Sequence, residues 1–243
     1  MTLTAAPDIQ AAFRELQASA AGATPAALIA AAVEKLGRTR VSVVSSFGAE
    51  SAVLLDAVAQ VDTAIPVLFL ETGRHFRQTL DYRDALVTRL GLRDVRDLKP
   101  DADALAAFDA DGQLWRTNPD HCCSLRKVIP LRRALEPFSC WINGRKRYQA
   151  ETRRNIEKVE LVDTHIKLNP LADLSAEEIE AWLTRRCLPR HSLSADGFFS
   201  IGCEPCTMRV APGEQPRDGR WRGSGKSECG IHLLAQPAAA KPL

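Results

Sequence analysis

Five of the seven cysteines lie in short motifs typical of metal binding or thiol chemistry. Cys122 and Cys123 are adjacent in "HCCSLRK", and Cys203 and Cys206 form a CxxC pair in "IGCEPCT". Four such thiols suit zinc or an iron–sulfur cluster. Structural zinc sites usually use C-x₂₋₄-C spacing, so the adjacent pair favours a [4Fe–4S] cluster. Zinc, or thiols that are only redox-active or buried, are the alternatives.

Cys229 lies outside these two pairs, in the glycine-flanked stretch "KSECGIH". Lys226 and Arg220 are near it in the sequence, and nearby cations lower the pKa of a thiol and raise its thiolate fraction. We therefore predict an exposed nucleophile, with an idle surface thiol as the alternative. Cys140 and Cys187 are predicted to be small buried hydrophobes.

The elements expected to position these residues alternate between strand and helix. The β-branched run 40–46 and the continuous apolar run 65–72 predict strands, the second buried on both faces. Alternation through residue 144 predicts an α/β fold, with a mainly parallel sheet and helices on both faces. Further helices are predicted over 7–19, 24–37, 49–61, 75–91, 124–137 and 175–187, and strands over 94–100, 138–144 and one short part of 159–173. Mostly loop is predicted after 188, with a disordered tail over 236–243.

Two loops follow predicted strands at the edge where open α/β sheets bind ligands. "SSFGAES" (45–51) leads into a helix, whose N-terminus favours anions, and Gly48 allows a phosphate to approach the backbone. No Lys-Ser/Thr follows the glycine, so it is not a Walker A loop. A plain strand–helix turn is the alternative. In "LFLETGRHF" (68–76), Arg74 is a candidate contact for a ligand phosphate or sugar.

Clustered basic residues lie beside these candidate sites. The stretch "NGRKRYQAETRR" (143–154) follows a predicted strand, and Arg126 and Lys127 follow the adjacent cysteines. Guanidinium forks match phosphate and sulfate oxygens, so we expect at least two of these cations to contact an anionic ligand. A solvated charged face is the alternative.

Composition bounds the class of protein. The chain has 243 residues, 45% hydrophobic and 26% charged, which suits one α/β domain with a sizeable core. A net charge of +2 predicts no strong affinity for nucleic acid or membranes. The N-terminus lacks the features of a signal peptide, and no run approaches the ~20 apolar residues of a membrane span. A cytoplasmic protein is expected, where seven cysteines point to metal binding or catalysis rather than disulfides.

Taken in order, SSFGAES, ETGR, CC-x₃-K, W-x-x-G-x-(K/R)-R-x-Q, CxxC and KxECGIH resemble the assimilatory adenylyl-sulfate reductases. These are the iron–sulfur branch of the phosphoadenylyl-sulfate reductase family. The resemblance runs from about residue 40 to 232. It implies a Rossmann-like adenine nucleotide α-hydrolase fold, with one reductase domain over 1–219 and a mobile C-terminal segment over 220–243.

The resemblance also implies a role for individual residues. Cys229 is the implied nucleophile, and Lys127 links the cluster's electrostatics to the substrate. The implied ligands of the [4Fe–4S] cluster are Cys122, Cys123, Cys203 and Cys206. The residues expected at the substrate are Ser45, Ser46, Phe47, Glu50, Ser51, Thr72, Gly73, Arg74, Arg126, Lys127, Gly144, Lys146, Arg147, Gln149 and Arg220.

The implied reaction reduces adenosine 5′-phosphosulfate (APS) to sulfite and AMP in assimilatory sulfate reduction and cysteine biosynthesis. Cys229 attacks the sulfur of APS and forms a thiosulfonate, and thioredoxin or a glutaredoxin-like dithiol then releases sulfite. A homo-oligomer is a further implication. No role is assigned to Glu228, and His232 is predicted to be structural.

Two alternative enzymes remain. "GRWRGSGK" looks more like the branch that acts on 3′-phosphoadenylyl sulfate (PAPS), so a PAPS reductase or dual-substrate enzyme is the first. The second is an ATP-pyrophosphatase-type ligase or tRNA thiolation enzyme on the same fold. Those enzymes carry an SGGxDS loop, whereas "SSFGAES" lacks the paired glycines and has Glu in place of Asp.

Overall fold

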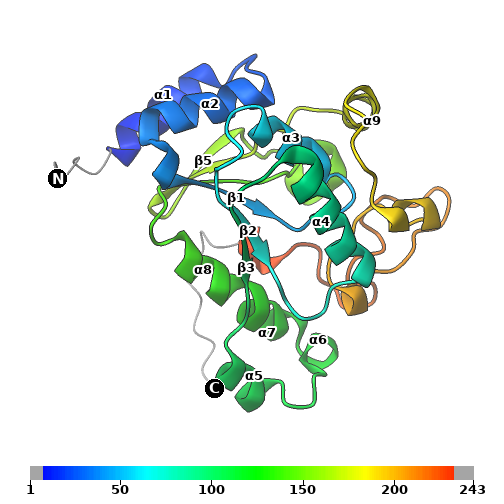
Figure 1. Ribbon diagram of the computed structural model, residues 1–243. Helices are drawn as coiled ribbons and strands as arrows, with labels where there is room; N and C mark the ends of the chain where they lie inside the picture. The colour runs from blue at the N-terminus through cyan, green and yellow to red at the C-terminus, as the bar shows by residue number, and fades with distance from the viewer. Residues whose placement is uncertain (1–7, 233–243) are drawn as a thin grey trace.

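The computed structural model describes residues 8–232 and is built around one six-stranded sheet (Figure 1). The strand order is β3-β2-β1-β4-β6-β5, and every neighbouring pair is parallel except β5 with β6. The predicted mainly parallel sheet is therefore confirmed. The strands are β1 (Val41–Ser45), β2 (Val67–Leu70), β3 (Val95–Leu98), β4 (Cys140–Ile142), β5 (Val159–Val162) and β6 (His165–Leu168).

Helices cover both faces of this sheet, as predicted. Alternate strand residues such as Val43 and Phe69 point into one core with α1–α4 and α9. Their neighbours Val44 and Leu68 point to the other face, where Leu131 of α8 packs. The helices are α1 (Ile9–Ser19), α2 (Pro25–Leu36), α3 (Ser51–Ala59), α4 (Arg77–Leu90), α5 (Ala102–Phe108), α6 (Leu114–Thr117), α7 (Pro119–Cys123), α8 (Ile129–Leu135) and α9 (Ala176–Arg185).

Local signals account for several helix boundaries. Helix α4 ends where Gly91 adopts a left-handed conformation (φ 64°), which a glycine tolerates without a Cβ clash. Helix α9 begins at a capping box, in which the side chains of Ser175 and Glu178 each bond the other's backbone N–H. Pro130 follows residues that are already helical, so its missing N–H removes one bond from a helix that continues from α7 into α8. The chain before it, Ser124–Val128, forms a π-helical turn.

The structure differs from the sequence predictions in several places. Residues 159–168 form two strands rather than one, joined by a tight turn in which Asp163 has φ 53°. The short helices α5, α6 and α7 lie between β3 and α8, where no element was predicted. Cys187 is exposed, so the prediction that it is buried is wrong. Cys140 is buried in β4, as predicted.

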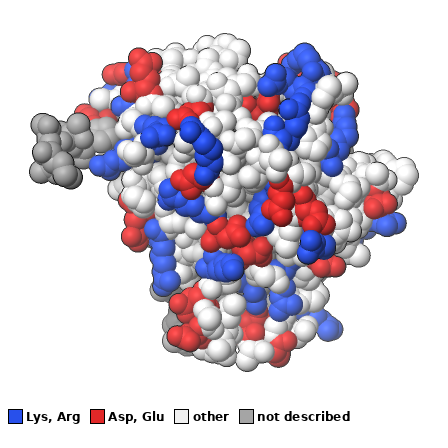
Figure 2. Space-filling view, viewed as in Figure 1, with Lys and Arg blue, Asp and Glu red and all other residues white. Residues whose placement is uncertain are grey.

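The surface carries both signs of charge. On the face drawn in Figure 2, Lys and Arg side chains are interspersed with Asp and Glu, as a net charge of +2 leads one to expect. In the described residues, no helix combines the length and the apolar character needed to cross a membrane. The predicted disordered tail over 236–243 lies outside the described residues.

Candidate active site

A cavity of about 1090 Å³, counting its open mouth, lies at the carboxyl edge of the sheet. The loops that follow β1 and β4 supply one part of its wall. Residues 199–202, 217–221 and 228–232, which are far away in sequence, supply another part. This is the edge at which open α/β sheets bind their ligands.

The loop after β1 is folded tightly against the floor of the cavity. Ser45 Oγ accepts a hydrogen bond from the N–H of Phe47 (3.2 Å), and Phe47 has φ 46°. Its buried ring packs edge-on against Phe69 (centroids 5.3 Å apart). A Cβ on Gly48 would lie 3.0 Å from the carbonyl oxygen of Ile201, so this position favours glycine. The loop therefore presents Ser45, Ser46 and Gly48 to the cavity.

Glu50 joins this loop to the basic stretch after β4. Its carboxylate accepts hydrogen bonds from Lys146 Nζ (2.6 Å), the Tyr148 hydroxyl (2.6 Å) and Gln149 Nε2 (2.7 Å). Burial by itself would raise the pKa of Glu50, but Lys146 and the other two donors outweigh burial and lower it. One wall of the cavity thus holds an ionised carboxylate paired with a lysine.

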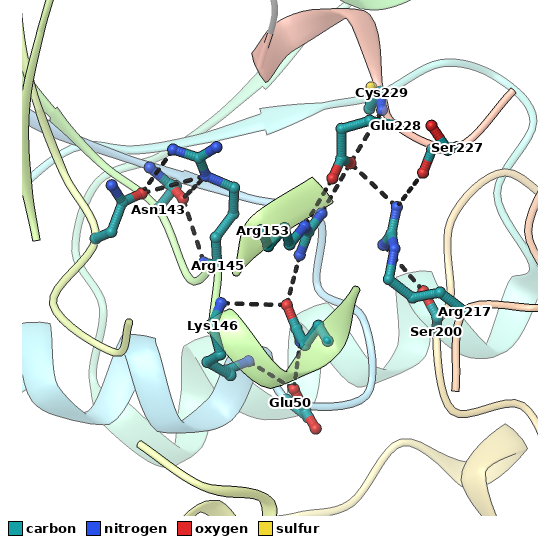
Figure 3. A network of polar contacts seen from close by, with 12 residues as sticks. Glu50, Asn143, Arg145, Lys146, Arg153, Ser200, Arg217, Ser227, Glu228 and Cys229 are labelled. Carbon is teal, nitrogen blue, oxygen red and sulfur yellow. Dashed lines mark hydrogen bonds and ion pairs between the residues drawn. The ribbon is translucent and has the colours of Figure 1, made fainter. Parts of the chain in front are cut away.

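A second ion-pair network reaches the C-terminal segment (Figure 3). Arg153 forms a two-pronged pair with Glu228, with Nε to Oε2 at 2.7 Å and Nη2 to Oε1 at 2.8 Å. Arg217 donates to the same carboxylate (3.0 Å) and also to Ser200 Oγ (3.3 Å). Arg153 is 7% exposed, Glu228 12% and Arg217 13%, so solvent screens these contacts weakly.

Cys229 lines this cavity and is only partly exposed, so the prediction that this thiol is exposed is wrong. While the Cys123 thiol keeps its proton, its hydrogen bond lowers the pKa of Cys229, and the positive charges of Lys127 and Arg220, which do not depend on that proton, act in the same direction against the effect of burial. Arg220 lines the cavity and stacks on the ring of Trp221 (4.3 Å). The arrangement favours a thiolate surrounded by cations.

The four paired cysteines line a second, much smaller cavity. Cys122 and Cys123 end helix α7, while Cys203 precedes a 3₁₀ turn at 204–206 and Cys206 is the last residue of that turn. All four are free thiols. Lys127 lines both cavities and therefore lies between the two sites.

These four thiols fit a polynuclear group better than a single ion. They are soft ligands, and they share a cavity whose wall also carries Arg126 and Lys127, which suit an anionic occupant. Within residues 8–232, no group of three or more His, Cys, Asp or Glu side chains lies close enough together to hold one metal ion. Adjacent cysteines such as Cys122 and Cys123 reach two iron atoms more easily than they converge on one ion, and this chemistry of the ligands is what suits an iron–sulfur cluster.

Ten of the predicted catalytic and substrate residues line the larger cavity. They are Ser45, Ser46, Glu50, Ser51, Lys127, Gly144, Lys146, Gln149, Arg220 and Cys229.

The other six predicted substrate residues lie elsewhere. Phe47 packs beneath the loop, Thr72 contacts Cys203 (Oγ1 to Sγ, 3.3 Å), and Gly73 follows it. The three remaining residues are arginines with protein partners. Arg74 donates to the carbonyl of Gly112 (2.8 Å), Arg126 pairs with the buried Asp109, and Arg147 pairs with Asp173.

Sequence patterns gave no role to several residues of the larger cavity. Arg217 lies in an irregular loop outside every quoted motif, and Glu228 belongs to KxECGIH but had no role or partner assigned from it. His232 was predicted to be structural. Its ring stacks on Trp141 (centroids 6.5 Å apart), yet it also lines the cavity, and burial lowers its pKa, as do nearby cations such as Arg145.

Comparison with known proteins places this site in context. Residues 40–209 match the model of the phosphoadenosine phosphosulfate reductase domain. An adenosine 5′-phosphosulfate reductase from Mesorhizobium japonicum is 46% identical over 209 residues, which cover 86% of this chain and 82% of that protein. A phosphoadenosine 5′-phosphosulfate reductase from Gloeobacter violaceus is 42% identical over 215 residues, covering 86% and 88%.

The fold is also found in solved structures. The phosphoadenylyl-sulfate reductase of Candida auris, in complex with phosphate, superposes with a TM-score of 0.70 at 24% identity, covering 86% of this chain and 99% of that one. An FMN adenylyltransferase of Candida glabrata superposes with a TM-score of 0.56 at 13% identity, covering 88% and 79%. These likenesses show an adenine nucleotide α-hydrolase-like fold, as predicted.

Proposed function

The chain belongs to the phosphoadenosine phosphosulfate reductase family, and from this premise we propose that it reduces APS to sulfite and AMP with Cys229 as nucleophile. The observation that carries the proposal is one cavity that joins the loop after β1, a set of cations and the Cys229 thiol. The relatives named as APS reductases support the same activity. The enzyme is then an oxidoreductase that acts on a sulfur group.

The first step is a transfer of the sulfuryl group to the enzyme. The Cys229 thiolate attacks the sulfur of APS, an S–S bond forms, and the bond between sulfur and the phosphate oxygen breaks. AMP leaves with that electron pair, and Cys229 carries a thiosulfonate, S–SO₃⁻. Because thiolate and sulfuryl oxygens repel each other, Lys127 and Arg220 are proposed to offset this charge and to orient the group.

The second step releases sulfite and consumes a dithiol. One thiolate of thioredoxin, or of a similar dithiol, attacks Cys229 Sγ, and sulfite leaves with the electron pair of the S–S bond. The second thiol of the partner then displaces Cys229 from the mixed disulfide. The dithiol thus supplies both electrons, and the Cys229 thiolate is regenerated. We propose that this takes place in the cytoplasm, where dithiols and free cysteines stay reduced. A homo-oligomer remains a prediction of the family resemblance.

Cys122, Cys123, Cys203 and Cys206 are the residues proposed to hold a [4Fe–4S] cluster. When bound, the cluster would supply a charged, polarisable neighbour to Lys127 and the substrate, rather than electrons for the reaction. Thr72, which contacts Cys203, ties the end of β2 to this cavity. The measurement that tests this is iron and acid-labile sulfide in anaerobically purified protein. Four of each per chain are expected, and stoichiometric zinc would contradict the cluster.

One contact favours APS over PAPS. The 3′-phosphate of PAPS needs a cation, and Lys146 is a candidate for it. Lys146 is already paired with Glu50, and a carboxylate at this position repels a further phosphate. The alternative, a PAPS reductase or dual-substrate enzyme, predicts comparable kcat/KM for the two nucleotides in the presence of thioredoxin.

Replacement of the nucleophile tests the central proposal. Cys229→Ser should keep its iron and bind nucleotide, yet form no thiosulfonate with APS when the intact protein is weighed by mass spectrometry. Cys187→Ser is the matched control, because that thiol is exposed and lies outside both cavities. Normal sulfite production by Cys229→Ser would refute the mechanism. Release of pyrophosphate from ATP by the native enzyme would favour the ligase alternative.

A further inference from the structure

We propose that Glu228 is a positioning residue, which latches the segment carrying Cys229 into the active-site cavity through Arg153 and Arg217. The proposal rests on the proposed function of Cys229, but its first test does not depend on catalysis. The latch consists of Glu228 with these two arginines. They come from three separate parts of the chain and meet only in the folded protein.

The geometry of the latch is that of a strong, oriented contact. Arg153 grips both oxygens of Glu228 (2.7 and 2.8 Å), and Arg217 binds one oxygen from the other side (3.0 Å). Arg217 also donates to the carbonyl of Ser227 (3.2 Å). Glu228 Oε1 in turn accepts the N–H of Cys229 (3.0 Å). The contact therefore restrains the backbone on both sides of Glu228 and, through it, the position of the thiol (Figure 3).

Arg153 also connects the latch to the other end of the cavity. Arg153 Nη1 donates to Gln149 Oε1, and Gln149 Nε2 donates to Glu50 Oε2 (2.7 Å). Glu50 begins the helix that follows the loop after β1. A continuous set of hydrogen bonds thus runs from the proposed nucleotide loop to the residue next to the nucleophile. Occupation of that loop can influence how firmly Cys229 is held.

An ionic contact suits a segment that must first stay in the cavity with Cys229 and later leave it. A buried ion pair adds little net stability compared with apolar packing, because both charges lose their hydration. Apolar contacts of Ile231 with the core around Trp141 already attach the segment. What the ion pair adds is sensitivity to competing anions. Once Cys229 carries a thiosulfonate, a second anion enters the cavity that Arg153 and Arg217 line and competes with Glu228 for them, which weakens the latch before the dithiol arrives.

Alkylation of Cys229 in the holoenzyme measures the latch directly. Without substrate, the rate of iodoacetamide labelling at Cys229 is followed by peptide mass spectrometry, at pH values where the rate no longer depends on pH. Glu228→Ala should raise this rate by about tenfold or more, and Glu228→Gln by less, because opening of the segment becomes more frequent. The control is Glu214→Gln, which removes another Glu–Arg pair (with Arg222, 2.7 Å) outside both cavities.

Single-turnover kinetics supply the second readout. Glu228→Ala should slow formation of the thiosulfonate by about tenfold or more, while its discharge by dithiol stays as fast as in the native enzyme or becomes faster. An unchanged rate of Cys229 alkylation in both Glu228 variants would overturn the latch proposal, even if the reductase activity is confirmed. Equal slowing of both half-reactions would also overturn it. If the native enzyme forms no thiosulfonate, the proposed function fails, and the alkylation result still decides the latch.

Discussion

Lys146 Nζ lies 2.6 Å from Glu50 Oε2, so a lysine in the wall of the larger cavity is paired with a carboxylate. Lys146 is 3% exposed and Glu50 26% exposed at the side chain, and burial lowers the pKa of Lys146 even though Glu50 acts to raise it. Glu50 comes from the loop after β1 and Lys146 from the basic stretch after β4. Their pairing decides whether this cation is available to a second phosphate.

Removal of the Glu50 charge should therefore change the choice of substrate. We expect Glu50→Gln to raise the ratio of kcat/KM for PAPS to that for APS by about fivefold, since one removed like-charge contact is worth on the order of 1 kcal/mol. The measurement is sulfite formation from each nucleotide with thioredoxin present. Tyr148→Phe is the control, because it deletes a hydrogen bond to Glu50 but leaves the ion pair in place. An unchanged ratio in Glu50→Gln would show that Lys146 does not select between the substrates.

Loss of one cluster thiol should be visible in the metal content. Cys203→Ser is expected to lose most of its iron and acid-labile sulfide, because a hydroxyl is a far poorer ligand for iron than a thiolate. Cys140→Ser is the matched control, since that thiol is fully buried in β4 and lines neither cavity. Iron and sulfide assays on anaerobically purified protein provide the comparison. Equal iron content in the two variants would remove Cys203 from the ligand set.

His191 should make the fold sensitive to acid. It is fully buried, with Nε2 bonded to Thr79 Oγ1 (3.0 Å) and Nδ1 accepting the N–H of Leu193 (3.3 Å). Both ring nitrogens are thus satisfied by the neutral ring, and burial lowers the pKa to about 4. The unfolded chain, with a pKa of about 6.5, binds more protons below that pH. Stability is therefore complete above about pH 6.5 and falls as the pH drops toward 4.

The expected contribution of His191 is a loss of about 2 kcal/mol in unfolding free energy between pH 7.5 and 5. The measurement is urea unfolding of the native protein and of His191→Gln at both pH values. The difference between their changes in unfolding free energy gives the contribution of His191, because the two proteins share all other titrating groups. The glutamine side chain can accept from Leu193 and donate to Thr79 without titrating. Equal pH dependence in the two proteins would mean that His191 is not the responsible group.

Local features of the sequence determined the main strands and helices of this protein. Apolar runs and helix caps predicted five of the six strands and the main helices, because both depend on residues close together in the chain. The spacing of the cysteines predicted one shared ligand cavity and one separate thiol, and the structure brings Cys122, Cys123, Cys203 and Cys206 to that cavity. The hairpin of β5 and β6 was missed in part, because its turn at 163–164 contains no glycine or proline that would separate the two strands in the sequence.

Only the tertiary structure decided which charges face the ligand and which face each other. Arg74, Arg126 and Arg147 have the same chemistry as Arg220, yet they are engaged with Gly112, Asp109 and Asp173 outside the larger cavity. The pairing of Glu228 with Arg153 joins residues 75 positions apart. Such pairings depend on how loops from separate strands converge at one edge of the sheet, and no local pattern in the sequence records that convergence.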